Sequence, residues 1–261
     1  MDMNKLFSVA GKTVLITGGS RGIGEMMAEA FVQGGAKVYI TARKAEELNA
    51  TATRLSSFGE CHAVACDLAT GAGISALVTR IKAENTALHV LINNAGCTWG
   101  ASIETFPEQG WDKVMDLNVK TPFFLVQQLL PLLEAGASNE DPARVINIAS
   151  VNGITTPTEG MDNYSYSASK AALIHLTRHL AATLNKNRIN VNGIAPGFFP
   201  SKMTAHWLVE GNDKTLLDAV PRQLGTPEDA AGTAIYLSSR ASAWVKGHTI
   251  VLDGGTVAQS G

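Results

Sequence analysis

Short apolar segments alternate with helical patterns along the whole chain, and this alternation limits the folds that the sequence can adopt. The apolar segments predict strands at Lys12–Thr17, Lys37–Thr41, His62–Cys66, His89–Ile92, Arg144–Ile148, Ile189–Ile194 and His248–Leu252. The patterns between them, mostly of ten or more residues, predict helices at Ile23–Gln33, Ala45–Ser57, Ile74–Ala83, Glu108–Asp116, Val119–Leu133, Tyr164–Leu184 and Pro227–Leu237. Strands that are apolar on both faces suit a parallel sheet covered by helices on both sides. The sequence therefore predicts an α/β fold.

The length and composition indicate one domain over residues 1–261. A chain of 261 residues is normal for a single α/β domain. The 45% hydrophobic and 17% charged content argues against disorder, and no linker or repeat interrupts the chain. A net charge of −2 without a basic run gives no sign of a nucleic-acid partner. We see no signal peptide and no apolar run long enough for a bilayer, so we expect a cytoplasmic protein without a membrane partner.

A glycine-rich turn joins the first predicted strand to the first predicted helix. It reads TGGSRGIG from Thr17 to Gly24. A helix N-terminus offers unpaired N–H groups and a partial positive charge to a phosphate, and glycines allow the close approach. This is the place where a dinucleotide pyrophosphate binds in a doubly wound fold. The alternative is a tight connection without a ligand, and the position after the first strand favours the nucleotide site.

The residues after the second predicted strand favour NADP(H) as the cofactor. An NAD site usually has an acidic residue there, on the ribose 2′-hydroxyl. Here the strand ends at Thr41 and is followed by Ala42 and Arg43, without an acid. Arg21 lies inside the glycine turn, so two guanidinium groups could hold a 2′-phosphate. The alternative is that both arginines are solvated surface charges.

Tyr166 and Lys170 are four residues apart in the segment YSASK, near the start of the longest predicted helix. This spacing places both side chains on one face of the helix. A lysine beside a tyrosine favours the phenolate, so we expect Lys170 to lower the pKa of the Tyr166 hydroxyl. Taken alone, the pair could be a chance feature of the surface.

Six motifs together resemble the short-chain dehydrogenase/reductase family. In chain order they are TGGSRGIG, NNAG, Asn118 in LNV, INIAS, YSASK and APG, and they extend from about Gly11 to Gly255. The resemblance implies a single-domain Rossmann fold, with a doubly wound, seven-stranded parallel sheet and helices on both faces. It also implies an oxidoreductase that assembles as a homotetramer or a homodimer. The missing acid and the two arginines favour NADP(H) as its cofactor.

The resemblance implies a catalytic set of four residues. Tyr166 would protonate the substrate oxygen, and Lys170 would contact the nicotinamide ribose. Ser150, at the end of the fifth predicted strand, would polarise the substrate carbonyl. Asn118 would hold a water that links Lys170 to solvent.

Three other hydroxyls lie near this set. The stretch between Ser150 and Tyr166 is slightly longer than is usual in the family, and Thr155 and Thr156 could compete for the role of the serine. Tyr164 has no lysine four residues further on, so we expect it to be structural or to face the substrate.

The resemblance also implies the residues of the cofactor site. Asp67 would contact the adenine, although a turn or a helix cap is its other interpretation. Ser201 stands where many relatives have a threonine for the carboxamide. The full expected set is Gly18, Ser20, Arg21, Gly22, Ile23, Gly24, Arg43, Asp67, Leu68, Asn94, Ala95, Gly96, Tyr166, Lys170, Pro196, Gly197, Phe199 and Ser201.

Among the subfamilies, the chain is most similar to 3-oxoacyl-(acyl-carrier-protein) reductases, particularly those of the rhamnolipid-biosynthesis type. The resemblance places a variable substrate lid at about 198–217. Five apolar side chains could face an acyl chain or pack against the core, namely Trp99, Phe198, Met203, Trp207 and Leu208.

An acyl carrier protein would need basic residues near the mouth of the active site. Lys186 and Arg188 could serve, but the segment Glu134–Asp141 is acidic where some relatives are basic. CoA thioesters and free ketones therefore stay open as substrates.

Two other functions are open to a chain with these motifs. One is a dehydrogenase or reductase of a sugar, polyol or polycyclic ketone, which would use the same machinery with a different pocket. The other is a non-catalytic NADPH-binding sensor or scaffold, which the intact catalytic set disfavours. A metal site is not expected, because His175 and His179 have no third ligand nearby in the sequence. We expect Cys61, Cys66 and Cys97 to be reduced thiols.

Overall fold

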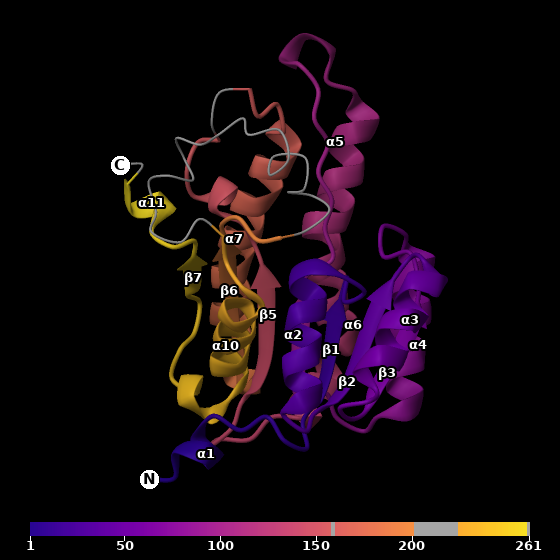
Figure 1. Ribbon diagram of the computed structural model, residues 1–261, viewed down its shortest axis with the longest axis vertical. Helices are drawn as coiled ribbons and strands as arrows, with labels where there is room; N and C mark the ends of the chain where they lie inside the picture. The colour runs from indigo at the N-terminus through magenta and orange to yellow at the C-terminus, as the bar shows by residue number, and fades with distance from the viewer. Residues whose placement is uncertain (158–159, 201–223, 260–261) are drawn as a thin grey trace.

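Seven parallel strands form one sheet in the order β3-β2-β1-β4-β5-β6-β7 (Figure 1). This is a computed structural model, and it describes residues 1–157, 160–200 and 224–259. The strands are β1 Thr13–Thr17, β2 Lys37–Ala42, β3 Cys61–Ala65, β4 Val90–Asn93, β5 Ala143–Ile148, β6 Ile189–Pro196 and β7 Thr249–Leu252. The strand order reverses between β1 and β4, where ligands of doubly wound folds bind. The predicted seven-stranded parallel sheet is confirmed.

Helices cover both faces of the sheet because neighbouring strand residues point to opposite faces. Val14 and Ile16 of β1 pack on one side, with residues of α2, α3 and α10. Leu15 packs on the other side, with residues of α4, α6 and α7. Figure 1 shows α2 and α10 side by side on the first face. The long helices are α2 Gly22–Gln33, α3 Ala45–Leu55, α4 Gly71–Glu84, α5 Glu108–Met115, α6 Thr121–Ala135, α7 Tyr164–Thr183 and α10 Pro227–Ser238.

The two predicted helices after β4 are joined into one continuous helical run. A π-helical turn, η2 Asp116–Lys120, connects α5 to α6. Single π turns inside α-helices occur frequently at functional sites, because they shift the side chains that follow. The turn contains Asn118, so the irregularity falls on one of the expected catalytic residues.

Short helical elements that the sequence patterns did not indicate fill several connections. They are α1 Met3–Leu6, η1 Ile103–Thr105, η3 Val151–Gly153, η4 Asn185–Asn187, η5 Arg240–Ser242 and α11 Thr256–Gln259. None of the helices in the described ranges has the length and apolar character needed to cross a bilayer.

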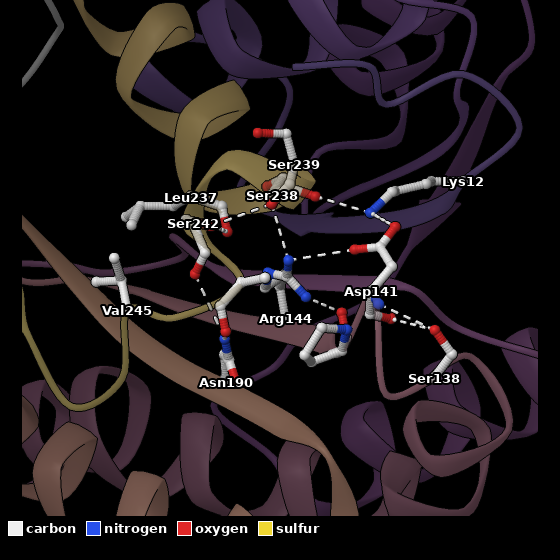
Figure 2. Close-up of polar contacts among 12 residues, drawn as sticks. Lys12, Ser138, Asp141, Arg144, Asn190, Leu237, Ser238, Ser239, Ser242 and Val245 are labelled. Atoms are coloured by element: carbon white, nitrogen blue, oxygen red, sulfur yellow. Dashed lines mark hydrogen bonds and ion pairs between the residues drawn. The ribbon is translucent and has the colours of Figure 1, made fainter. Parts of the chain in front are cut away.

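A charged cluster lies at the amino ends of β1 and β5, at the edge of the sheet opposite the site described below (Figure 2). The Asp141 carboxylate pairs with Lys12 Nζ at 2.7 Å and with Arg144 Nη2 at 3.2 Å. Lys12 also donates to the carbonyl of Ser238, and Arg144 to that of Ser239, at 2.9 and 2.8 Å. These carbonyls stand at the end of α10, where cations satisfy unpaired acceptors and oppose the helix dipole. The cluster therefore ties α10 to two strands.

Candidate active site

An open cleft of about 310 Å³ lies at the carboxyl ends of β1, β2 and β4, where the strand order reverses. Most residues that the sequence assigned to the cofactor line it, namely Gly18, Ser20, Arg21, Gly22, Ile23, Gly24, Arg43, Asp67, Leu68, Asn94, Ala95, Gly96, Tyr166 and Lys170. Residues that the sequence analysis did not anticipate also line it, namely Thr41, Ala42, Lys44, Glu47, Cys66, Cys97, Leu117 and Ile148.

The glycine turn presents bare backbone to this cleft. Gly18 and Gly22 have φ angles of +66° and +57°, a region that glycine adopts without strain. A Cβ on Gly24 would stand 2.3 Å from the carbonyl oxygen of Gly18, so no side chain fits there. Helix α2 begins at Gly22, and its amino end faces the cleft. This combination of a cradle without side chains and a helix N-terminus fits a dinucleotide pyrophosphate.

Asn94 holds the glycine turn against β4. Its side-chain Nδ2 donates to the carbonyl oxygens of Thr17 at 2.9 Å and Gly18 at 3.0 Å. In return, Thr17 Oγ1 accepts hydrogen bonds from the backbone N–H groups of Asn94 and Ala95. The floor of the cleft is therefore fixed by hydrogen bonds between the ends of β1 and β4.

An acidic side chain stands at the outer end of the cleft, where the sequence analysis found none. Glu47 lies in the first turn of α3, four residues beyond Arg43. Its carboxylate accepts a hydrogen bond from Ser20 Oγ at 3.1 Å and pairs with Arg21 Nη1 at 3.2 Å. The sequence contains this acid, but only the docking of α3 beside the glycine turn shows that it reaches the cleft. Arg43 is exposed and lines the same end.

Asp67 lines the cleft and also stabilises a turn. It lines the cleft beside Leu68, and Cys66 separates it from the end of β3. Its Oδ1 also accepts a hydrogen bond from the backbone N–H of Ala69 at 3.1 Å, which stabilises the turn into α4.

Lys170 and Tyr166 meet at the inner end of the cleft. Lys170 Nζ donates to the carbonyl oxygen of Ile148 at 2.7 Å and lies 5.5 Å from the centroid of the Tyr166 ring. Ser150 follows β5 and hydrogen-bonds to the half-buried Tyr166 side chain. Burial lowers the pKa of Lys170 to about 8. The end of β5 and the first turns of α7 thus bring a phenol, a hydroxyl and an ammonium together.

The pKa of Tyr166 differs from the sequence expectation. Burial raises the pKa of its hydroxyl, and the hydrogen bond with Ser150 offsets part of this rise. The Lys170 ammonium is directed at the Ile148 carbonyl and stands over the ring. Tyr166 is therefore a protonated phenol near neutral pH, which makes it a proton donor.

Asn118 is buried behind Lys170 and bound to the backbone of Cys97. Its Oδ1 accepts from the Cys97 N–H at 2.9 Å, and its Nδ2 donates to the Cys97 carbonyl at 3.0 Å and to Ser169 Oγ at 2.9 Å. A Cβ on Gly96 would stand 3.2 Å from Asn118 Oδ1 and 3.6 Å from Lys170 Nζ. Gly96 thus lies between the two expected catalytic side chains.

The described residues of the last expected cofactor group, Pro196, Gly197 and Phe199, are not among those that line the cleft. Pro196 ends β6, and the Gly197 N–H donates to the carbonyl of Leu252 at 2.9 Å. The Phe199 ring is buried in the core against Gly225, so its side chain is not among those that line the cleft. Ser201 lies outside the described residues, as do Met203, Trp207 and Leu208.

Other polar and aromatic candidates are engaged in local contacts. Trp99 packs against Gly110 of α5, with Lys113 Nζ 5.2 Å from its ring centroid. The Tyr164 hydroxyl donates to Asp162 Oδ1 at 3.0 Å. Thr155 Oγ1 donates to the Val151 carbonyl, so its hydroxyl is engaged with the backbone. Ser150 is thus the hydroxyl that meets Tyr166.

Lys186 and Arg188 lie at the wrong edge of the sheet for a carrier protein at the mouth of the cleft. The Arg188 carbonyl accepts from the N–H of Ala143, the first residue of β5. The acidic segment Glu134–Asp141 also precedes β5 and reaches this amino edge. The cleft opens at the carboxyl edge, so neither the basic pair nor the acidic segment bears on delivery there.

His175 and His179 form no metal site within the described ranges. No group of three or more histidine, cysteine, aspartate or glutamate side chains is arranged there to hold a metal ion. His175 and His179 are exposed on α7. The three cysteines are free thiols, and burial raises the pKa of each, to about 11 for Cys61 and Cys66.

Comparison with known proteins identifies relatives over nearly the whole chain. The family model of the short chain dehydrogenases matches residues 12–210. The chain is 48% identical over 258 residues to a rhamnolipids biosynthesis 3-oxoacyl-[acyl-carrier-protein] reductase of Pseudomonas aeruginosa, which covers 97% of this chain and 99% of the relative. It is 37% identical over 260 residues to a 5-keto-D-gluconate 5-reductase of Escherichia coli, covering 97% of this chain and 98% of that protein. The solved Pseudomonas aeruginosa RhlG/NADP active-site complex superposes with a TM-score of 0.90 at 48% identity, covering 98% of this chain and all of that one.

Proposed function

The chain belongs to the short-chain dehydrogenase family of oxidoreductases, and on this premise we propose that it uses NADPH to reduce the ketone of a 3-oxoacyl thioester to a secondary alcohol. One observation carries the proposal. Tyr166, Ser150 and Lys170 converge at the inner end of a cleft whose other end is a glycine cradle for a dinucleotide.

NADP(H) is the cofactor we propose because the outer end of the cleft is rich in cations. Arg21, Arg43 and Lys44 line that end, where a 2′-phosphate attached to the adenosine ribose would lie. The solved relative at 48% identity is an NADP complex. The turn that contains Gly18, Gly22 and Gly24 would hold the pyrophosphate. The adenosine half of the cofactor would contact Asp67, Leu68, Asn94, Ala95 and Gly96. The backbone of Pro196, Gly197 and Phe199 would flank the nicotinamide, while the Phe199 ring packs in the core. The contact expected of Ser201 lies outside the described residues.

The bound nicotinamide would supply a hydride to the carbonyl carbon of the substrate. Tyr166 would donate its proton to the carbonyl oxygen, and its raised pKa keeps that proton in place near neutral pH. Ser150 would donate a second hydrogen bond to the same oxygen, which stabilises the negative charge that develops there.

Lys170 and Asn118 would restore the proton that Tyr166 gives up. A lysine with a pKa of about 8 exchanges protons readily near neutral pH. Asn118 would order a water between Lys170 and solvent. Its bonds to Cys97 and Ser169 fix the side chain beside the lysine.

An acyl thioester is the substrate class we propose because the relative with 48% identity is named as a 3-oxoacyl-[acyl-carrier-protein] reductase. Delivery by an acyl carrier protein stays in the proposal, because the acidic segment before β5 lies at the opposite edge of the sheet. Such a role belongs to fatty acid metabolism in the cytoplasm. The predicted lid at about 198–217 lies, from residue 201 on, outside the described residues.

We also propose that residues 1–261 form one domain that assembles as a homotetramer or a homodimer. Apolar side chains are exposed on α5 and α6 and near β7, namely Trp111, Phe123, Trp244 and Val251. Burial between subunits would remove this surface from water. Light scattering of the purified protein gives the assembly size directly.

A sugar ketone is the second candidate substrate, because a 5-keto-D-gluconate 5-reductase is 37% identical over nearly the same length. The test is the loss of NADPH absorbance with a short 3-oxoacyl-CoA, a long 3-oxoacyl-CoA, a 3-oxoacyl carrier protein and 5-keto-D-gluconate in parallel. Turnover of thioesters that rises with chain length supports the proposal. Turnover of the keto sugar alone would replace it with the second candidate.

A further inference from the structure

We propose that Glu47 sets the preference between NADPH and NADH, because its carboxylate holds the same donors that would recognise the 2′-phosphate. This inference rests on the proposed use of NADPH. It concerns a residue that has no place in the proposed chemistry and that lies far along the cleft from Tyr166.

Glu47 receives the hydrogen bonds that an anionic ligand would need. Ser20 Oγ donates to its Oε1 at 3.1 Å, and Arg21 Nη1 lies 3.2 and 3.3 Å from its two carboxylate oxygens. All three residues line the cleft. Ser20 and Arg21 belong to the glycine turn, so the donors are fixed to the backbone that would cradle the pyrophosphate. The Glu47 carboxylate thus engages the hydroxyl and guanidinium donors that would suit a phosphate.

A 2′-phosphate would have to displace or share these donors. It carries up to two negative charges, so it would repel the Glu47 carboxylate while it competes for Arg21. Arg43 and Lys44 line the same end and are exposed, so their attraction is weakened by solvent. The carboxylate therefore lowers the affinity for NADPH below the value that the cations alone would give.

The Glu47 carboxylate would favour the binding of NADH. Its adenosine ribose has a 2′-hydroxyl, which can donate a hydrogen bond to an acid at the end of the second strand. Glu47 is not at that position in the sequence, but the docking of α3 brings it to the same end of the cleft. One residue would thus weaken NADPH and support NADH.

Replacement of Glu47 can be tested without loss of the local fold. Thr51 of α3 donates to the carbonyl of Ser20 at 2.8 Å, so the helix is tied to the glycine turn independently of Glu47. Leu48 is fully buried and anchors the same turn of α3 in the core. Glu47→Gln keeps the shape of the side chain, removes its charge and replaces one acceptor oxygen with an NH2 donor.

The experiment measures dissociation constants by fluorescence titration with NADPH and NADH, in the absence of substrate. The fragments 2′,5′-ADP and 5′-AMP isolate the contribution of the 2′-phosphate. Because the side chains are partly exposed, we expect Glu47→Gln to bind NADPH and 2′,5′-ADP about fivefold more tightly. We expect NADH to bind about twofold more weakly and 5′-AMP to follow NADH.

Two controls make the result specific. Glu46→Gln removes a neighbouring exposed charge from the same turn of α3, and we expect no change in the NADPH to NADH ratio. In an Arg21→Ala background, Glu47→Gln should lose most of its effect on NADPH, because the competition is for Arg21.

The possible outcomes separate this inference from the proposed function. Unchanged or weaker NADPH binding in Glu47→Gln overturns the inference, since the carboxylate would then be neutral or would position Arg21 usefully. An equal effect of Glu46→Gln overturns it as well. Failure of the unmodified chain to bind either dinucleotide would instead overturn the proposed function.

Discussion

The ammonium of Lys170 donates a hydrogen bond to the carbonyl oxygen of Ile148, the last residue of β5, at 2.7 Å. The bond ties the first turns of α7 to the end of the strand that precedes Ser150. It also holds the ammonium in a buried position over the ring of Tyr166. The depressed pKa of Lys170 follows from this burial.

The pKa of Lys170 predicts an alkaline limit to cofactor binding. The ammonium is the form that donates to ribose hydroxyls, and it predominates below its pKa of about 8. We therefore expect NADPH affinity to be level below pH 8 and to fall as the pH rises above it. Titration of binding across this range checks the prediction. If the Lys170→Met variant loses NADPH affinity over the same pH range, the titrating group is another residue.

The same shift acts on stability in the opposite direction. Between about pH 8 and pH 10 the unfolded chain binds more protons than the folded one, because Lys170 keeps its ordinary pKa when unfolded. The cost of burying the ammonium is thus fully present below pH 8 and disappears as the pH rises through this window. Lys170→Met should flatten this part of the stability curve in chemical denaturation.

Tyr166→Phe should abolish turnover and leave NADPH binding intact. The phenylalanine keeps the ring beneath Lys170 but has no proton to donate to the substrate oxygen. Loss of general acid catalysis slows the chemical step by about a hundredfold or more. The turnover rate and the NADPH dissociation constant of the variant, measured beside those of the unmodified chain, test this prediction. Substantial residual turnover would remove Tyr166 from the proposed catalytic role.

Gly24→Ala should disrupt the glycine turn and with it dinucleotide binding. The new Cβ would meet the Gly18 carbonyl oxygen at 2.3 Å, and this oxygen belongs to the backbone of the turn, which cannot move aside as a flexible side chain could. Gly232→Ala on α10 is the matched control, because its Cβ would meet nothing within 4 Å. That control should gain about 1 kcal/mol of helix stability. Equal NADPH affinity in both variants would contradict the predicted cradle.

Arg43→Ala should raise the Michaelis constant for NADPH far more than that for NADH. Arg43 lines the outer end of the cleft, and its guanidinium is available to a 2′-phosphate there. A lost charge-assisted hydrogen bond corresponds to about tenfold in binding. Steady-state kinetics with both cofactors provides the comparison. Similar changes for the two cofactors would exclude Arg43 from recognition of the 2′-phosphate.

Asp141→Asn should destabilise the chain without changing the chemistry of the cleft. The substitution leaves Lys12 and Arg144 buried without their shared counter-charge (Figure 2). Removing one partner of a buried ion pair costs about 3 kcal/mol in the free energy of unfolding. Asp116→Asn, in the exposed pair with Lys120, should cost less than about 1 kcal/mol. Denaturant unfolding of the two variants tests this contrast.

The strands and the glycine turn could be predicted because their signals are local. The runs KTVLIT and RVINI are apolar on both faces, and the glycines of the first turn stand directly after a strand. The place of Tyr166 and Lys170 also followed from a spacing within one helix. These features depend on residues that are neighbours in the sequence.

Features that depend on packing between distant segments could not be predicted in this way. Glu47 reaches the cleft only because α3 docks beside the glycine turn, and Phe199 turns into the core because it packs against Gly225. The pKa of Tyr166 depends on how deeply α7 is buried. The position of Lys186 and Arg188 at the amino edge is predictable, since in a parallel sheet the connection from a helix into the next strand lies at that edge.

The charged cluster of Lys12, Asp141 and Arg144 lies at the edge of the sheet opposite the cleft (Figure 2). Evolution can therefore adjust the two edges of this molecule separately. Substitutions at Asp141 would change the stability of the fold and leave the catalytic groups as they are. Substitutions at Glu47 would change the preference between NADPH and NADH, because α3 is held to the glycine turn by Thr51 independently of Glu47.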